Sequence, residues 1–365
     1  MEFIHFRHDV TKNGEKMPKY AQETGVKPLY YNMRGEKKYE IGQNRIYVNK
    51  ITCDTLTQYL RTFVYYVKAR SNVYIFAFAT LISFLLGSHG GAADYSIAVR
   101  VVFSSYLMAL ATYIYNDVVD FEVDKINKTN RPSVTGKAIR RQLIMIVLVL
   151  NVTALLLTFS VGVYELSISV LFVTLGFAYS HPRLNLKDKF PVKTVVTAAG
   201  AALLSLLGGS AAFTTTITSS YNGSNFLLSY CLPVGYAALF FFSFFFILGP
   251  LGDICDLKGD RAVGRRTFPI VLGIKSTILF MLSMPLTMIF MVGLLAYYSY
   301  HDNPTSTINL SGVCLIVGTC IGTLVFILRI SKQANANNVL AIKSMRPKMR
   351  LLHIILQISL LFTFL

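Results

Sequence analysis

The sequence has few charged residues, fewer still that are acidic, and no tryptophan. Charged residues make up 15% of the chain, whereas average soluble domains carry about 25%. Asp and Glu number 18 among 365 residues, while hydrophobic residues account for 53%. So few charges cannot cover so large an apolar fraction with a polar surface, which excludes an ordinary soluble cytosolic enzyme.

Cysteine is also scarce and follows no pattern. The five cysteines are scattered without a CxxC pair or a cluster with histidine. This excludes a disulfide framework and a zinc site, and it favours small buried apolar side chains. The first 30 residues are polar and charged, so they lack the apolar core of a cleavable signal peptide.

Long apolar runs are what the sequence does contain. A helix needs about 20 apolar residues to cross roughly 30 Å of hydrocarbon. The stretches that meet this requirement are 73–87, 97–115, 143–163, 165–179, 193–212, 226–249, 276–298, 308–330 and 351–365. The sequence therefore predicts an all-α fold, a polytopic membrane bundle of nine transmembrane helices.

The basic residues are distributed very unevenly among the segments between these runs. A net charge of +17 first suggests nucleic-acid binding. If the N-terminus is inside, however, the inside segments hold 34 of the 35 Lys and Arg residues, and only Arg100 is left. This bias is typical of membrane topology. We therefore predict a bilayer environment, no nucleic-acid partner, a cytosolic N-terminus and a C-terminus outside.

Residues 1–70 differ in composition from the rest of the chain. They mix charge with Gly, Pro and Tyr, and residues 1–54 carry no motif. Apolar residues recur at helical spacing over about 55–68, which predicts an amphipathic helix lying on the cytosolic membrane surface. We therefore divide the chain into a cytosolic tail, 1–70, and a transmembrane domain, 71–365.

Acidic residues beyond the tail cluster in two segments. Seven of these 11 residues lie in 116–124 and 253–260, each predicted to follow the inside end of a span. The first segment contains Asn116, Asp120 and Asp124 at i, i+4 and i+8. The second contains Asp253, Asp256 and Asp260 at i, i+3 and i+7. Each set therefore lies on one face of a helix, with Asp117 close to the first.

Two rows of carboxylates at a membrane boundary repel one another and are costly to desolvate. A divalent cation removes that cost. Oxygen ligands without His or Cys favour Mg²⁺, which takes one or two carboxylates together with substrate phosphate oxygens. The alternative is that these acids cap helices or pair with neighbouring cations. Two similar segments on the same side of the membrane favour the metal.

Cations and aromatic rings accompany the acidic segments. Arginine matches phosphate oxygens with two parallel hydrogen bonds, so carboxylates, Mg²⁺ and guanidinium groups together describe a diphosphate clamp. Among the inside cations we favour Arg131, Arg183 and Lys187. Tyr113, Tyr115 and Tyr179 lie near the inside ends of spans, where their rings could stabilise a carbocation in a central cavity.

Three segments resemble a known family. NDVVDFEVDKINKTNRPSVTGKAI is similar to the first aspartate-rich signature of the UbiA superfamily of membrane prenyltransferases, NDxxDxxxD followed by NKxxRPxxxG. DICDLKGDRAVGRRTFPIVLG is similar to its second signature, and YSHPRLNLK to its YSxP…LK segment. The resemblance covers about 70–350. It implies nine helices around a central cavity, in which two Mg²⁺ ions bridge the diphosphate of a prenyl diphosphate.

The resemblance also implies roles for residues at matching positions. The implied metal ligands are Asn116, Asp117, Asp120, Asp124, Asp253, Asp256 and Asp260. The implied catalytic residues are Asp120, Asp256, Arg131, Tyr179 and Lys187. The implied substrate-binding residues are Arg183, Ser180, Lys128, Tyr113, Tyr115, Arg70 and Asn72. Many relatives have Arg-Pro where this chain has Arg70-Ser71-Asn72, which departs from the family pattern.

The implied activity is Mg²⁺-dependent transfer of a prenyl group to a lipophilic acceptor through an allylic carbocation, with release of diphosphate. The sequence leaves the acceptor and the prenyl chain length open. An alternative within the superfamily is a terpene cyclase, in which the substrate's own double bonds attack the cation. A third hypothesis is a non-catalytic membrane protein that uses the acidic rows to bind or transport cations.

Overall fold

A computed structural model describes residues 56–88, 94–126, 131–135, 138–216, 231–302, 308–336 and 338–365. The chain divides into two compact units, Met1–Thr55 and Leu56–Leu365. Residues 1–55 of the predicted tail 1–70 lie outside the described residues, as does Lys128.

Among the described residues, nine helices are long and apolar enough to cross a membrane, which confirms the predicted all-α membrane bundle. They are α3 (Tyr74–Ser88), α4 (Tyr95–Val119), α6 (Arg140–Phe159), α7 (Val163–Ser180), α8 (Val192–Thr216), α9 (Leu232–Ala262), α11 (Gly273–Asp302), α12 (Leu310–Asn335) and α13 (Val339–Phe364). The shorter elements are α2 (Leu56–Ala69), η1 (Ser71–Val73), α5 (Phe121–Ile126), η2 (Leu186–Asp188) and α10 (Phe268–Val271).

Two helices extend well past the apolar runs that predicted them. The sixth span was expected to end at residue 249, but α9 continues through Pro250 to Ala262. The last was expected to begin at residue 351, but α13 begins at Val339. An apolar run ends at the first cluster of charged residues, but the backbone hydrogen bonds of the helix continue past that cluster. The second acidic segment therefore lies within a helix rather than beyond its end.

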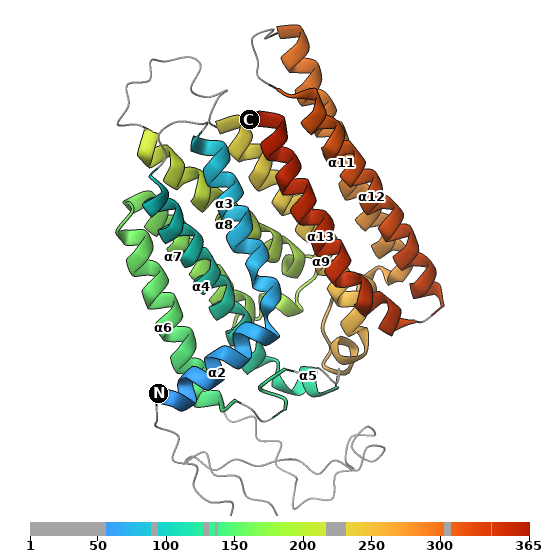
Figure 1. Cartoon of the computed structure of the whole chain (residues 1–365). Helices are drawn as coiled ribbons and strands as arrows, with labels where there is room; N and C mark the ends of the chain where they lie inside the picture. Colours follow the sequence, from blue (N-terminus) through green and yellow to red (C-terminus); the bar gives the residue numbers. More distant parts are fainter. Residues whose placement is uncertain are drawn as a thin grey trace, which may run out of the picture. The chain divides into compact units, whose positions relative to one another are not determined.

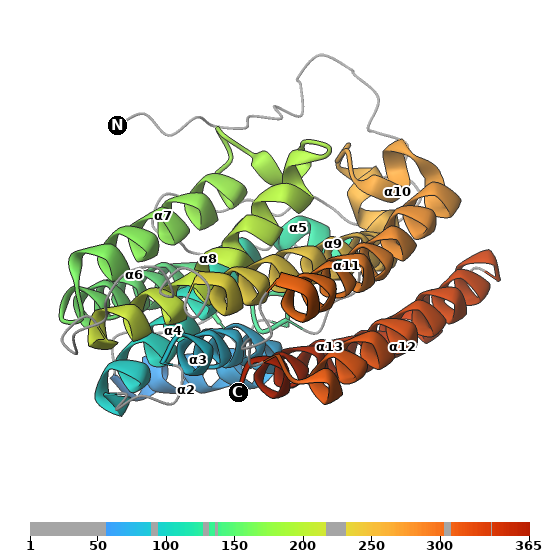
Figure 2. The same ribbon diagram turned by 90° about the horizontal axis from the view of Figure 1, so that it is seen from above.

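The helices pack in two groups (Figures 1 and 2). One apolar cluster is formed mainly by α3, α4, α6, α7 and α8, with Phe241 and Phe245 of α9. A second is formed mainly by α9, α11, α12 and α13, with Ile82 and Leu86 of α3. Helix α3 contacts α4, α8, α9 and α13, so it connects the two groups. Helices α2 and α5 lie at one end of the bundle, and the C-terminus lies at the other (Figure 1).

Helix α2 occupies the range predicted for the amphipathic helix. Tyr66 is fully buried, and the Thr62 hydroxyl donates to the Gln142 side chain of α6 at 3.3 Å. Leu60 and Val64 are exposed on the other side, near the exposed Arg61. Such a mixed apolar and basic face is typical of interfacial helices. Its position at a membrane surface stays a prediction.

Helices α6 and α7 are joined by only three residues. The turn follows Phe159 and ends before Val163, and none of its residues is charged. At this end of the bundle the Arg100 guanidinium donates to the Ser160 carbonyl at 2.9 Å and to the Ser160 hydroxyl at 3.1 Å. Arg100, the one basic residue that does not lie in a predicted inside segment, therefore has a hydrogen-bonding partner in this turn.

Small residues allow α3 and α8 to approach closely. The Thr80 side chain of α3 reaches the α8 backbone, because its hydroxyl donates to the Leu204 carbonyl at 2.8 Å. A side-chain carbon added at Gly208 would overlap the carbonyl oxygen of Thr80. Close backbone approach at small residues is a common way to pack helices in lipid.

We expect Gly208→Ala to destabilise the folded protein, because backbone atoms cannot move aside as a flexible side chain can. Overpacking typically costs about 1–3 kcal/mol. Gly293→Ala in α11 is the matched control, since nothing lies within 4 Å of the added carbon. Thermal unfolding of the two purified variants in detergent checks this. Equal melting temperatures would mean that the α3–α8 contact is looser than described.

Candidate active site

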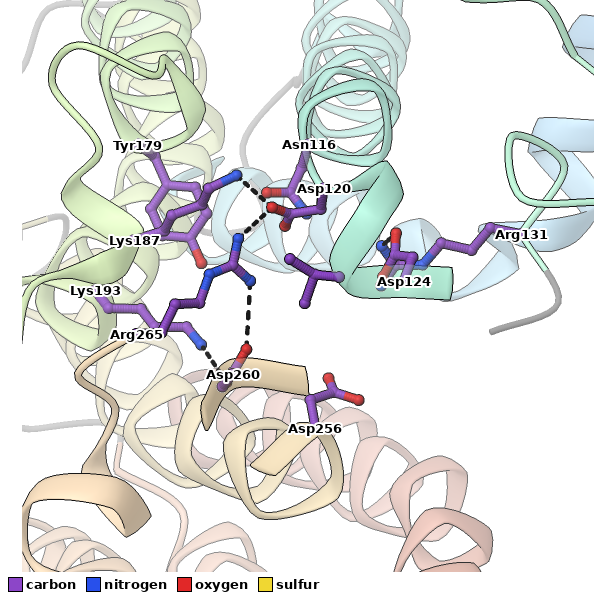
Figure 3. A pocket seen from close by; sticks show the side chains of 11 residues that line it. Asn116, Asp120, Asp124, Arg131, Tyr179, Lys187, Lys193, Asp256, Asp260 and Arg265 are labelled. Atoms are coloured by element: carbon purple, nitrogen blue, oxygen red, sulfur yellow. Dashed lines mark hydrogen bonds and ion pairs between the residues drawn. The ribbon is translucent and has the colours of Figure 1, made fainter. Parts of the chain in front are cut away.

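The first acidic segment lies where α4 passes into α5. Asp120 separates the two helices, with φ −88° and ψ 14°. Helical hydrogen bonding nevertheless continues across it, because the Asp120 amide donates to the Asn116 carbonyl at 2.8 Å and the Asp124 amide donates to the Asp120 carbonyl at 2.9 Å. The predicted i, i+4, i+8 spacing is therefore kept, and all three side chains reach one cavity (Figure 3).

The two acidic segments share this cavity, whose volume is about 110 Å³. Asp256 and Asp260 of α9 face it from the wall opposite α4 and α5 (Figure 3). The lining residues are Asn116, Asp120, Val123, Asp124, Arg131, Tyr179, Lys187, Lys193, Asp256, Asp260 and Arg265. The structure thus brings together side chains that lie up to about 150 residues apart in the sequence.

Arg265 connects the two walls. Its guanidinium pairs with Asp120 of the first segment and lies 3.4 Å from Asp260 of the second. It also donates to Asp188 in η2 at 2.7 Å. Burial raises the pKa of Asp120, but Arg265 and Lys187 lower it by more, so this pKa lies below its usual value. Asp120 is therefore held as a carboxylate.

The end of α9 explains how Arg265 reaches the cavity. Gly264 adopts φ +72°, a conformation that glycine takes without steric cost. The Arg265 amide then donates to the Asp260 carbonyl at 2.9 Å, and the Gly264 amide donates to the Arg261 carbonyl at 3.2 Å. These are the two hydrogen bonds of a Schellman motif. The motif turns the chain back, so that Arg265 lies beside the helix it has just left.

Lys187 approaches from the segment between α7 and α8. Asn185 precedes η2 with φ 48°, a left-handed conformation that Asn tolerates better than most residues. Lys187 is 3% exposed, and its ammonium lies 2.6 Å from Asp120. Burial lowers the pKa of Lys187, and the neighbouring Asp120 only partly offsets this. At the end of α7, the Ser180 hydroxyl donates to the Asn116 side chain at 3.1 Å.

Arg131 and Arg70 neutralise the other acids of the first segment. Arg131 pairs with Asp124 and lies 2.9 Å from Asp117. Arg70 also pairs with Asp117, its Nε donating at 3.0 Å. Burial raises the pKa of Asp124 to about 7, with Arg131 lowering it and Asp117 raising it further. Burial lowers the pKa of Arg70, but Asp117 raises it above its usual value.

Two of the predicted metal ligands do not line the cavity. Asp253 is buried against Lys193, whose ammonium also lies 3.7 Å from Asp260. Asp117 is fully buried between Arg70 and Arg131. The geometry favours positioning of these cations by the two carboxylates. Metal ligation by Asp117 and Asp253 stays a prediction.

Several predicted substrate-binding residues also lie away from the cavity lining. Tyr115 stacks on Phe177, with ring centroids 5.4 Å apart. Tyr113 lies under the Arg70 guanidinium, 5.1 Å from its centre. Arg183 is exposed, and Asn72 is half-buried in η1. The described structure therefore gives direct cavity positions to Tyr179, Lys187 and Arg131, and leaves these other roles as predictions.

Sequence reasoning did not single out Arg265, Lys193 or Asp188. Arg265 was one of several inside-loop cations, and the signal that could have identified it is the glycine directly before it, after a helix end. Lys193 lies in the first turn of an apolar helix, where a buried lysine requires an anionic partner. Asp188 carried no sequence signal, because its role depends on a contact with Arg265.

The cavity residues fit a magnesium ion in their chemistry. The donors are carboxylate and amide oxygens, without His or Cys. Asp256 forms no ion pair or hydrogen bond with another described residue, and Asp260 Oδ2 is buried without a hydrogen-bond partner. No three acidic, His or Cys side chains of the described residues converge as a complete metal site. A Mg²⁺ ion here would need oxygens from its substrate, as Mg²⁺ sites commonly do.

The fold and the cavity define a class, the multi-pass membrane proteins with a buried, highly charged cavity at one end of a helix bundle. The sequence model of the UbiA prenyltransferase family matches residues 76–351. The chain belongs to this family of prenyltransferases.

Individual relatives are more distant. The chain is 30% identical over 171 residues to the digeranylgeranylglyceryl phosphate synthase of Sulfurisphaera tokodaii, which covers 47% of this chain and 56% of that one. It is 26% identical over 186 residues to the enzyme of the same name from Methanosphaera stadtmanae, covering 50% and 61%. The chain thus matches little more than half the length of these curated relatives.

Solved structures share the fold. A digeranylgeranylglyceryl phosphate synthase structure superposes with a TM-score of 0.60 at 18% identity, covering 84% of this chain and 99% of that one. A UbiA homologue from Archaeoglobus fulgidus, bound to GPP and Mg²⁺, superposes with a TM-score of 0.57 at 15% identity, covering 81% and 99%. At these identities the likeness establishes the common architecture.

Proposed function

We propose that this protein transfers a prenyl group from a prenyl diphosphate to a lipophilic acceptor within the membrane, in a Mg²⁺-dependent reaction that releases diphosphate. One observation carries the proposal: carboxylates from α4–α5 and from α9 share a buried cavity that is crossed by Lys187, Lys193 and Arg265. Carboxylates alone would favour a cation site. Cations interleaved with them favour a site for a metal-bound anion.

Asn116, Asp120, Asp124, Asp256 and Asp260 are the residues that would hold magnesium. Bound Mg²⁺ supplies positive charge that neutralises diphosphate oxygens. We assign the cations of this chain to the same leaving group. As the allylic carbon–oxygen bond breaks, its electron pair stays with the diphosphate, whose growing negative charge is stabilised by preorganised cations. Lys187, Lys193 and Arg265 are held for this task by Asp120, Asp253 and Asp188.

Breaking that bond leaves an allylic carbocation, which must be kept from water until the acceptor attacks. Aromatic rings lie in the bundle beside the charged layer. Phe76 contacts Tyr113, Phe241 and Phe245, with ring centroids 5.2–6.2 Å apart. We assign to this group the apolar surface that receives the prenyl chain. The faces of such rings favour a nearby cation.

The relatives support the same chemistry. Those with curated names synthesise digeranylgeranylglyceryl phosphate, which favours a lipophilic acceptor. The A. fulgidus homologue binds GPP and Mg²⁺, which favours a prenyl diphosphate as donor and magnesium as cofactor. The number of ions, proposed as two, rests on the presence of two carboxylate walls.

Release of diphosphate by the purified, membrane-reconstituted protein tests this proposal. We expect release from C10 to C20 prenyl diphosphates with Mg²⁺ and none when the metal is chelated. No release under either condition would support a non-catalytic cation-binding protein instead. If diphosphate is released, mass spectrometry of the products distinguishes transfer of the prenyl group from its cyclisation. A prenylated lipid supports transfer, whereas a new cyclic hydrocarbon formed without acceptor would identify a cyclase.

The orientation that we propose has the charged end of the bundle in the cytosol and the C-terminus outside. Single cysteines at Ala336, between α12 and α13, and at Tyr95, at the start of α4, lie at opposite ends of the bundle. In a variant without the five native cysteines, we expect an impermeant thiol reagent to label position 95 from outside intact cells. Position 336 should label only after the membrane is opened. Labelling of both from one side would contradict the topology.

A further inference from the structure

Two arginines of α13, Arg346 and Arg350, differ from the cations that line the cavity. Each basic residue that lines the cavity pairs with at least one aspartate, namely Arg131, Lys187, Lys193 and Arg265. Arg70 pairs likewise with Asp117. Arg346 and Arg350 are half-buried, and neither forms an ion pair with any acidic residue that the structure describes.

Arg346 lies against the helix that carries the second acidic segment. A side-chain carbon added at Gly252 of α9 would lie 3.5 Å from a terminal nitrogen of Arg346. Gly252 is one turn from Asp256 along α9. Cys255, between them, has Arg346 and Asp256 as electrostatic neighbours. The Arg346 guanidinium is therefore beside the layer of cavity carboxylates, on the side of α13.

Arg350 faces the start of α3. It follows Arg346 by four residues, which places both on one face of α13. Its electrostatic neighbours are Arg346, Tyr113, Tyr74 and Arg70. Ile354, one further turn along the same face, packs against the apolar cluster of α3 and α4. This row of α13 therefore lies on the side that packs against α3, and α13 also contacts α9.

The two arginines and the residues proposed to bind diphosphate also differ in their position along the axis of the bundle. Beyond Arg350, His353 is fully buried. Its ring stacks on Phe241 and lies tilted against Phe244, with centroids 4.7 and 4.4 Å apart. Arg350 is thus between the carboxylate layer and the aromatic layer. One helical turn, about 6 Å, separates it from Arg346 toward the membrane centre.

Half-buried guanidinium groups in a membrane span are costly unless an anion neutralises them. Arg70, another basic neighbour of Arg350, already pairs with Asp117. Two guanidinium groups one turn apart suit a group with several oxygens in different directions, as a phosphate monoester has. Tyr74 of α3 and Tyr113 of α4 are also electrostatic neighbours of Arg350, and each carries a hydroxyl group.

We propose that Arg346 and Arg350 form a second anion site, which binds the phosphate headgroup of the lipid acceptor. The proposal rests on the proposed function, since it names the acceptor class for that reaction. The site lies toward the apolar layer, so the hydrocarbon part of a lipid bound there stays in the membrane. Arg70 and Asp117 connect it to Arg131 of the diphosphate clamp. The donor and the acceptor thus bring their phosphates to two separate groups of cations.

Binding of an alkylglycerol phosphate tests the site without turnover. We would measure its Kd for the full chain in zwitterionic lipid nanodiscs, without Mg²⁺ or prenyl diphosphate. Arg346→Gln and Arg350→Gln should each raise the Kd about tenfold or more, because each removes a charge-assisted pair with phosphate. Arg350→Lys should recover part of the loss. Arg329→Gln on α12, which replaces an exposed arginine near Phe326, is the matched control and should leave the Kd unchanged.

Three competitors identify the source of the anion. The same alkylglycerol without phosphate should bind at least about tenfold more weakly. Displacement by equal concentrations of inorganic phosphate would show a site for a free anion and would overturn the proposal. Displacement by phosphatidylglycerol in the nanodisc would show a structural lipid site and would also overturn it. Wild-type affinity in both Gln variants would exclude the two arginines.

The kinetics separate this proposal from the proposed function. In Mg²⁺-dependent turnover, Arg350→Gln should raise KM for the phosphorylated acceptor and leave KM for the prenyl diphosphate unchanged. A variant that is merely misfolded would lose both, and its elution in size exclusion would change. If the wild-type protein released no diphosphate yet bound the alkylglycerol phosphate through these arginines, the proposed function would fail and the anion site would stand.

Discussion

Replacing Asp256 by alanine is expected to lower Mg²⁺-dependent diphosphate release by at least about a hundredfold, with the bundle still folded. The reason is its position. Asp256 faces the cavity, and no ion pair or hydrogen bond joins it to another described residue. In the proposed metal site its removal would take a ligand from magnesium without leaving a buried cation unpaired. Activity should fall while the melting temperature without metal stays within error of the wild-type value.

Asp120→Ala makes the contrasting case, because Asp120 pairs with Lys187 and Arg265. Loss of one partner of a buried pair is destabilising, so this variant should lose both activity and stability. Glu122→Gln is the matched control: Glu122 lies on α5 beside the site but is exposed and does not line the cavity. It should retain wild-type release. Near-normal activity in Asp256→Ala would remove Asp256 from the metal site.

Replacing Arg265 by glutamine should have an effect of similar size through a different route. Removing one preorganised donor from a developing anion costs about 10²–10³ in kcat. Arg265 also holds Asp120, Asp188 and Asp260 together, so its loss should lower the melting temperature as well. Arg265→Lys should recover little activity, because an ammonium cannot form the planar, multiple contacts of a guanidinium.

The matched control is Arg261→Gln, which replaces an exposed arginine at the end of the same helix. Diphosphate release and thermal unfolding should both stay at wild-type values there. The two readouts also test the assignment of Arg265. A large loss of stability with unchanged kcat would make Arg265 a purely structural link between the walls, and would leave stabilisation of diphosphate to Lys187 and Lys193.

The number of spans and the acidic rows could be predicted because they depend on local sequence. Hydrophobic length identifies a span, and spacings of three and four residues keep side chains on one helical face. The convergence of Asp120 and Asp260 on one cavity was an inference from family resemblance and from their common side of the membrane. In the structure α5 contacts α9, and both aspartates line the same cavity.

What the sequence could not reveal depends on tertiary contacts. The neighbouring helices decide what an aspartate side chain faces. Asp253 and Asp256 are three residues apart, yet Asp253 pairs with Lys193 of α8 and Asp256 faces the cavity. Arg265 and Arg266 are adjacent and similar in sequence, yet only the first turns inward after Gly264. The helix ends were misjudged for a related reason, since charges on a buried face end an apolar run without ending a helix.

The three-residue turn between α6 and α7 has a consequence for biogenesis. A linker this short holds the start of α7 at the end of α6, so the two helices lie in the lipid as a paired hairpin. Because its residues carry no charge, moving this turn across the hydrocarbon costs less than moving a charged loop. Once across, the turn is fastened by Arg100.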